Sequence, residues 1–250
     1  MAKWKVEKWG NAGEKQLVAA APIAVGETIL CEKPLVTVPA DQHELGTYAW
    51  DLTHKLLANA SLRNTYYSWQ LKSEDVFPPL HNDTEIERLL AKRYGVQRTL
   101  VRKLYVGVVT NNIVFGAGEK AITGYGMYKT LSRANHSCDP SAAMVAVDPV
   151  AGEQGLAAKL PIQPGQEITW SYCGEDNGFL QQDYLIRNLS LVRDMGFVCR
   201  CSRCKKELPS DLKGVDRLRF FMDFLAQHED SITKRATGTL AGAGDLVQGK

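Results

Sequence analysis

Three cysteines lie within six residues of one another, at Cys199, Cys201 and Cys204. Thiolates at this spacing can bind one metal ion from a single loop, a pattern typical of structural zinc sites. The alternative is a group of free or partly buried thiols. Structural zinc takes four ligands in a tetrahedron, so the pattern predicts one further ligand elsewhere in the chain.

The fourth ligand has three candidates among the other cysteines. Cys31 lies in an apolar segment, where we expect a small buried hydrophobic residue. Cys173 follows the end of an expected strand. Cys138 lies in the polar stretch Asn135-His136-Ser137-Cys138-Asp139-Pro140, so we expect Cys138 to complete the site and to tie the C-terminal segment to the middle of the chain. Four thiolates leave no open position for water, so the zinc would be structural.

A tyrosine ends the segment Gly165-Gln166-Glu167-Ile168-Thr169-Trp170-Ser171-Tyr172. Alone, Tyr172 would be a buried strand residue. His136, taken alone, would be a loop histidine with satisfied hydrogen bonds. Tyr172 and His136 become candidates for a functional site only when the two stretches that contain them are considered together with the cysteines.

The composition limits the class of protein. The chain has 250 residues, is 44% apolar and 23% charged, and carries a formal net charge of +2, which gives no general attraction to nucleic acid or membranes. It has no run of eighteen apolar residues, and its N-terminus lacks the apolar core of a signal peptide. We therefore expect a reducing compartment, where clustered cysteines favour metal binding over disulfides.

β-Branched and apolar segments predict strands within residues 16–38 and 113–172. In the second region, residues 142–147 and 156–160 predict a hairpin across Asp148–Glu153, and residues 168–172 predict a strand.

Helical spacing appears in three runs between these regions, within residues 42–72, after Asp83 as N-cap, and up to Asn111-Asn112. A basic cluster in this part is expected to be the solvated face of a helix, with a surface for an acidic partner as the alternative. The cluster comprises Lys92, Arg93, Arg98, Arg102 and Lys103.

Two further helices are predicted towards the C-terminus, at residues 179–195 and 212–226, and residues 237–250 are expected to be loosely ordered. The apolar side of the first is expected to comprise Leu180, Tyr184, Leu185, Leu189 and Val192.

Together the three stretches resemble SET-domain protein methyltransferases. The shared motifs are Asn135-His136-Ser137-Cys138-x-Pro140, then Gly165-x-Glu167-Ile168-Thr169-x-Ser171-Tyr172, then Phe197-x-Cys199-x-Cys201-x-x-Cys204. The SMYD-like branch, in which an insertion splits the domain, is most similar, and the run from Leu17 to Leu35 also fits it. The resemblance covers about residues 6–204.

The resemblance implies an α+β, β-rich fold of small sheets around a pseudoknot, with a helical insertion and a post-SET zinc site. The corresponding division is residues 1–40 and 113–178 for the SET domain, 41–112 for the insertion, 179–208 for the zinc segment, and 209–250 for a helix and tail. Residues 40–112 contain no cysteine, so we expect the MYND zinc module of this branch to be missing.

The resemblance also implies the site residues. Asn135 and His136 would hold the methionine end of S-adenosylmethionine, Phe197 would contact its adenine, and Tyr172 would be the catalytic tyrosine beside the cofactor. The segment ending at Lys15-Gln16-Leu17 matches the N-terminal cofactor loop. Tyr128 and Met195 would line the lysine channel. Cys138, Cys199, Cys201 and Cys204 match the post-SET zinc ligands.

The resemblance therefore implies methyl transfer to a lysine of a protein substrate. We expect a monomer in the cytoplasm, the nucleus or both, with no membrane and no direct nucleic-acid ligand. Some positions depart from the family pattern: Glu14, Gln16, Ser141 and Met195. The departures at Glu14, Gln16 and Met195 motivate the alternative of a weak or inactive SET-like binding module. A nucleic-acid-binding zinc module is a third hypothesis, supported only by Arg200, Arg203, Lys205 and Lys206.

Overall fold

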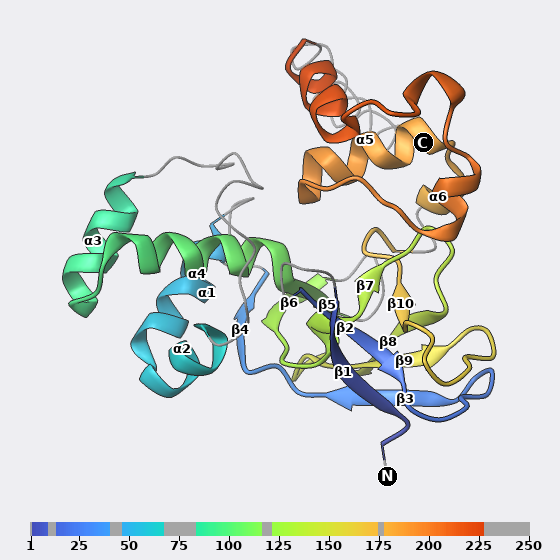
Figure 1. Ribbon diagram of the computed structural model, residues 1–250. Coiled ribbons are helices and arrows are strands. Elements are labelled where there is room, and N and C mark those ends of the chain that lie inside the picture. The colour runs from blue at the N-terminus through green and yellow to red at the C-terminus, as the bar shows by residue number, and fades with distance from the viewer. Residues whose placement is uncertain are drawn as a thin grey trace, which may run out of the picture. The chain divides into compact units, whose positions relative to one another are not determined.

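The structure is a computed structural model that describes residues 2–9, 14–40, 47–67, 84–116, 122–174 and 178–227. These residues fall into two compact units: residues 1–181 with 201–203, and residues 182–200 with those from 204 onward. Small sheets and helices together make an α+β fold (Figure 1). None of the described helices combines the length and apolar character needed to cross a bilayer. The five-part division of the chain stays a prediction.

The first sheet pairs β1 (Trp4–Trp9) with β2 (Glu14–Ala19) in antiparallel register. Strand β1 was not predicted, because its charged residues gave only a weak apolar pattern. It forms because β2 offers a buried, β-prone partner: Leu17, Val18 and Ala19 are at most 1% exposed. We expected a loop at residues 10–15, but Glu14 and Lys15 lie in β2, because they continue its pairing with β1. Residues 10–13 lie outside the described residues.

The second sheet has the order β3-β9-β8, with β3 at Thr28–Glu32, β9 at Glu153–Ala158 and β8 at Ala142–Asp148. It confirms the hairpin. The turn is stabilised by Asp148, whose Oδ1 atom accepts the N–H groups of Val150 and Ala151.

The third sheet has the order β4-β6-β5, with β4 at Val36–Pro39, β6 at Ile122–Met127 and β5 at Asn112–Gly116. Glycine is required at Gly124, because a Cβ there would lie 2.5 Å from the carbonyl oxygen of Val38.

A short parallel pair joins β7 (Asn135–His136) to β10 (Thr169–Trp170). The predicted strand at 168–172 is therefore only two residues long. The flanking residues instead bond to β2: the Ile168 N–H donates to the Leu17 carbonyl at 2.8 Å. The threading of the expected pseudoknot stays a prediction.

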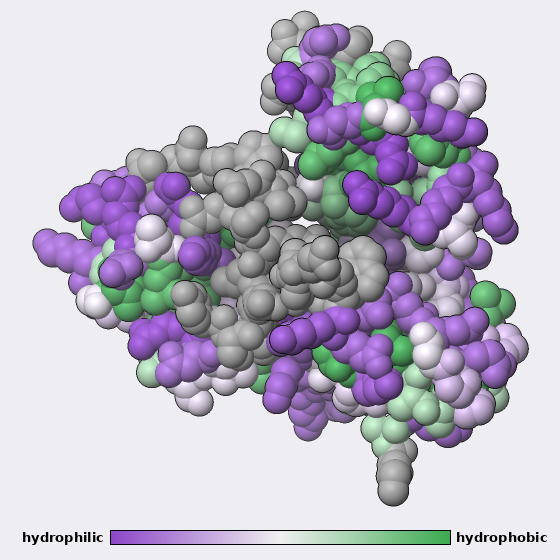
Figure 2. All heavy atoms as spheres, viewed as in Figure 1, coloured by the Kyte–Doolittle hydropathy of each residue, from purple (hydrophilic) through white to green (hydrophobic). Residues whose placement is uncertain are grey.

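The helical insertion consists of α1 (Tyr48–Ala58), α2 (Ala60–Tyr67), α3 (Thr84–Tyr94) and α4 (Arg98–Asn111). Helices α1 and α4 pack together, and α1 also contacts β4 (Figure 1). Their core includes Leu52, Leu56 and Leu104, all fully buried. On the face shown in Figure 2, the visible surface of this insertion is mainly hydrophilic, with a smaller hydrophobic area.

The predicted helix at 42–72 is divided at Asn59. This residue has an extended backbone (φ −115°, ψ 105°), and its Oδ1 atom accepts the Leu62 N–H at 3.1 Å. It therefore ends α1 and caps α2. The end of α4 at Asn111 is as predicted, whereas the Asp83 cap and residues 68–72 lie outside the described residues.

Part of the basic cluster pairs within the insertion. Both Arg102 Nε and Nη2 donate to the Glu87 carboxylate at 2.8 Å, and Arg98 Nη2 lies 3.6 Å from it. Because Glu87 is buried, these contacts neutralise a carboxylate that would otherwise be costly to bury.

A 3₁₀ turn, η3 (Phe179–Gln181), precedes α5 (Tyr184–Met195), so the predicted helix at 179–195 is interrupted. Asp183 caps α5 by accepting the Ile186 N–H at 2.9 Å, which favours a start at this point. After α6 (Ser202–Lys206) come η4 (Ser210–Leu212) and a helix at 217–227, in place of one helix at 212–226. Residues 237–250 lie outside the described residues.

Candidate functional site

The Asn135-His136 stretch lies beside the segment that leads to Tyr172. Parallel pairing places Asn135 opposite Thr169, and the Ser137 N–H donates to the Trp170 carbonyl at 3.0 Å. The Asn135 Nδ2 atom donates to Glu167 Oε1 at 2.7 Å. Two of the three predicted stretches therefore meet, and the Asn135 side chain is held by an acid from the second.

The Tyr172 hydroxyl is held by the Ala134 carbonyl, to which it donates at 3.1 Å. The Trp170 indole Nε1 donates to the same oxygen, also at 3.1 Å. A carbonyl oxygen has two lone pairs, so these donors fill it. The hydroxyl hydrogen of Tyr172 is therefore engaged within the protein.

Burial raises the pKa of Tyr172 above its usual range. Glu167 raises this pKa further, while Arg133 acts in the opposite direction. The side chain is therefore a neutral phenol at physiological pH and acts as a hydrogen-bond donor towards Ala134, not as a phenolate base.

The side chain of His136 contacts both Tyr172 and Cys138. Its Nδ1 atom accepts the Tyr172 N–H at 3.1 Å, and its Nε2 atom lies 3.4 Å from the Cys138 Sγ atom. The ring also meets Tyr172 and Phe179 edge-on, with centroid distances of 5.4 and 5.9 Å. A cofactor contact from His136 would therefore come from its backbone.

A carboxylate from β3 holds the segment that enters this motif. The two carboxylate oxygens of Glu32 accept the N–H groups of Lys129, Thr130 and Leu131 at 2.8 to 3.1 Å. The carboxylate thus provides acceptors for the backbone N–H groups at the start of the turn η2 (Leu131–Arg133). Sequence reasoning missed this role of Glu32, because its partners lie about a hundred residues away and leave no local pattern.

The residues predicted to belong to the N-terminal cofactor loop lie in β2. Leu17 is fully buried in the core, whereas Lys15 and Gln16 are half-buried. Burial, and the nearby charges of Arg133 and Lys8, lower the pKa of Lys15. An anion would be favoured near this cation, so a cofactor role for Lys15 stays a prediction with a physical basis.

Tyr128, predicted for the lysine channel, is fully buried in the core cluster. Its hydroxyl donates to the Gly152 carbonyl in the β8–β9 turn. The structure thus gives this side chain a packing role, and its channel role stays a prediction.

Met195 and Phe197 lie in the second unit, and both are half-buried. Met195 is the last residue of α5, and Gly196 ends the helix in the left-handed region (φ 68°). The Gly196 N–H donates to the Val192 carbonyl at 3.0 Å, which defines the point where the chain leaves the helix towards Phe197.

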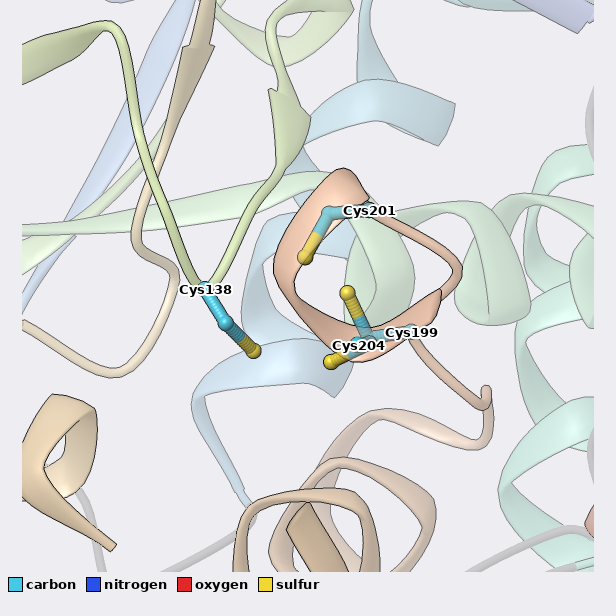
Figure 3. A group of neighbouring side chains, drawn as sticks. All are labelled: Cys138, Cys199, Cys201 and Cys204. Carbon is cyan, nitrogen blue, oxygen red and sulfur yellow. The ribbon is translucent and has the colours of Figure 1, made fainter. Parts of the chain in front are cut away.

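The four cysteines predicted as metal ligands form a cluster. The Sγ atoms of Cys138, Cys199, Cys201 and Cys204 all lie within 4.8 Å of one another. Figure 3 shows the four sulfurs pointing toward a common centre. Zinc–sulfur bonds of about 2.3 Å in a tetrahedron separate the sulfurs by about 3.8 Å, so the donor set fits zinc. By contrast Cys31, expected to be buried, is exposed.

The chain matches the SET domain family model over residues 14–173 and belongs to the SET-domain family. The match begins at β2 and ends one residue beyond Tyr172. It therefore includes the helical insertion and the Asn135-His136 stretch, and it ends before α5.

Curated relatives match over shorter stretches. A histone-lysine N-methyltransferase SET5 of Yarrowia lipolytica is 34% identical over 94 residues, which is 37% of this chain and 20% of the relative. A SET and MYND domain-containing protein of Dictyostelium discoideum is 35% identical over 86 residues, or 34% of this chain and 23% of the relative. The matched segments thus span about a fifth of these relatives.

Among solved structures, the chain matches the SET domain of LSMT bound to lysine and AdoHcy. It has a TM-score of 0.48 and 15% sequence identity, and the match covers 79% of this chain and 53% of that one.

Proposed function

We propose that this chain transfers a methyl group from S-adenosylmethionine to the side-chain amine of a lysine in a histone or another protein. The observation that carries the proposal is the Tyr172 hydroxyl, held on the Ala134 carbonyl next to the Asn135-His136 stretch of a SET domain. The name of the SET5 relative supports the reaction class.

S-adenosylmethionine supplies a methyl group on a sulfonium, which a neutral lysine amine takes as the carbon–sulfur bond breaks and leaves a thioether. Such a displacement needs alignment more than acid–base chemistry. We propose that Tyr172 provides it. Its hydroxyl hydrogen is engaged by Ala134, so towards the substrates its oxygen would act as an acceptor for polarised C–H or N–H groups.

The target lysine must lose a proton before it can attack. Low polarity around the amine favours its neutral form. A neutral Tyr172 adds no negative charge that would hold the lysine protonated, in keeping with its raised pKa. We propose that the proton leaves to solvent before the amine is enclosed, because Tyr172 is already engaged as a donor.

We propose that Asn135 and His136 bind the methionine end of the cofactor, His136 through its backbone, that Lys15, Gln16 and Leu17 border it, and that Phe197 contacts the adenine. Met195 and Tyr128 are proposed to shape the lysine channel. A zinc ion on the four clustered cysteines would supply no chemistry; it would hold the segments carrying Cys138 and Phe197 in place.

We further propose that the chain is of the SMYD-like branch without the MYND module. Support comes from the helical insertion between β4 and β5 and from the similarity to a SET and MYND protein. The name of the histone-lysine methyltransferase relative also supports a nuclear or cytoplasmic place of action.

The competing function is a SET-like module that binds proteins without catalysis, motivated by the departures at Glu14, Gln16 and Met195. A calorimetric titration of the purified protein with S-adenosylmethionine separates the two. Catalysis predicts saturable binding and a higher melting temperature with the cofactor. If saturating cofactor gives no binding heat and no stabilisation, the binding module is the better account.

A further inference from the structure

Helix α5 buries polar side chains, although apolar side chains of the same helix are exposed. Its buried residues are Tyr184, Arg187, Asn188, Leu191 and Val192. Tyr184 and Val192 are buried as predicted, but Leu185, predicted on the same side, is 44% exposed, and Ile186 is 47% exposed. Burying an arginine costs several kcal/mol unless it is paired. These buried polar side chains therefore need neighbouring groups to pair with.

Arg187 has no exposed side-chain surface and contacts a cysteine of the cluster. Its Nη2 atom lies 3.8 Å from Cys204 Sγ and 2.5 Å from an oxygen of Glu207, and its Nη1 atom donates to the Gln182 carbonyl. The guanidinium is thus anchored at two further points, so its donor towards sulfur is held in place.

Asn188, the next residue, contacts two cysteines of the cluster. Its Oδ1 atom accepts the Cys199 N–H at 2.8 Å. Its Nδ2 atom donates to the Tyr184 carbonyl at 2.9 Å and lies 3.9 Å from Cys204 Sγ. One side chain therefore fixes the backbone at one thiol and offers an N–H to another.

Metal binding by the four thiolates would explain why these polar side chains are buried next to the cysteines. Four thiolates around a divalent ion leave two net negative charges, which are costly to bury without compensation. A fixed cation and N–H donors directed at sulfur lower that cost and hold ligands in the orientation that the metal needs.

We propose that Arg187 and Asn188 are positioning residues for the metal centre. Arg187 offsets the charge of the Cys204 thiolate, and Asn188 orients Cys199 and Cys204. Both residues lie beyond the segment matched to the SET domain. The inference rests on zinc binding at the cysteine cluster and is independent of whether the chain transfers methyl groups.

The test measures zinc release from the purified protein to a chromogenic chelator. Arg187→Met removes the donors while keeping an unbranched side chain, and Arg187→Lys restores the charge. Arg193→Met is the matched control, because Arg193 lies on the same helix but is 51% exposed and pairs with Asp194. We expect release about 10- to 100-fold faster for Arg187→Met, an intermediate rate for Arg187→Lys and no change for Arg193→Met.

Asn188→Asp covers the case in which Arg187→Met fails to fold. It keeps the shape and the acceptor for the Cys199 N–H, but it places a carboxylate oxygen where an N–H donor faced Cys204. We expect faster zinc release and a weaker thiolate-to-cobalt absorption band after cobalt substitution. Wild-type release rates and an unchanged cobalt spectrum in folded Asn188→Asp would overturn the inference. A wild-type chain that binds no zinc would overturn it together with the metal assignment, whatever a methyl-transfer assay gives.

Discussion

The His136 ring accepts the backbone N–H of Tyr172 at its Nδ1 atom, at 3.1 Å. An accepting Nδ1 leaves the ring proton of neutral histidine on Nε2, which faces Cys138 Sγ at 3.4 Å. One side chain thus joins the residue proposed for the reaction to a proposed metal ligand. This explains why a histidine in a polar loop is only 9% exposed.

The two contacts of His136 can be separated by substitution. The Asn amide approximates Nδ1 and the Gln amide approximates Nε2. His136→Asn should therefore keep most of the turnover and release zinc faster, whereas His136→Gln should do the reverse, with turnover falling about 10- to 100-fold. Turnover and zinc release would be measured on the same preparations. Equal effects of the two variants on both quantities would contradict the separation.

Glu32 should be important for stability, because its carboxylate accepts three backbone N–H groups before the Asn135 motif. Glu32→Gln retains one acceptor oxygen and places an NH₂ group against N–H donors. We expect the free energy of unfolding to fall by about 2 kcal/mol, measured by urea denaturation. Glu27→Gln is the control, since Glu27 pairs with Lys3 at the surface and should change stability far less. A Glu32→Gln protein as stable as the wild type would contradict this role.

Tyr128 can be tested for packing against a channel role. Tyr128→Phe removes the donor to the Gly152 carbonyl and leaves the ring in the core. We expect the free energy of unfolding to fall by about 1 kcal/mol in thermal or urea denaturation, with the same methylated products. Tyr125→Phe is the control, because its ring stacks on Tyr48 at 3.9 Å. A changed number of methyl groups on the product, with stability intact, would favour the channel.

Much of the site could be predicted from spacing, because local motifs carry it. The tight cysteine spacing and the polar setting of Cys138 indicated the cluster, and the strand pattern indicated the β8–β9 hairpin. Long-range partners could not be predicted in the same way. The contacts of Glu32 span about a hundred residues, and β1 depends on pairing with β2 more than on its own pattern.

The buried face of α5 was misjudged for a related reason. Apolar residues offered a stripe through Leu185, but the helix buries Arg187 and Asn188 beside the cysteines instead. A periodicity argument places the most hydrophobic residues on the buried face. Here the buried face contacts cysteine sulfur atoms, which favour hydrogen-bond donors. A polar pair at the centre of an amphipathic helix, a few residues before a cysteine cluster, is the signal that could have found it.

Stability should fall at alkaline pH. Burial, together with Tyr48, raises the pKa of Tyr105 to about 12, and burial also raises the pKa of Tyr172. In the unfolded chain a tyrosine ionises near pH 10. The stabilisation from the neutral phenol is therefore complete below about pH 10 and is lost as pH rises towards 12. Urea midpoints between pH 8 and 12 would measure this decline, and Tyr105→Phe should reduce it. A midpoint that is constant over this range would contradict the prediction.

Methyl transfer by the Tyr172→Phe protein tests the central claim most directly. Purified wild-type, Tyr172→Phe and Tyr125→Phe proteins would be incubated with a cell extract and isotopically labelled S-adenosylmethionine, and labelled lysines would be counted by mass spectrometry. We predict lysine labelling by the wild type and Tyr125→Phe, and a loss of at least about 100-fold for Tyr172→Phe with cofactor binding retained. Full labelling by Tyr172→Phe, or no labelled lysine with the wild type, would contradict the account.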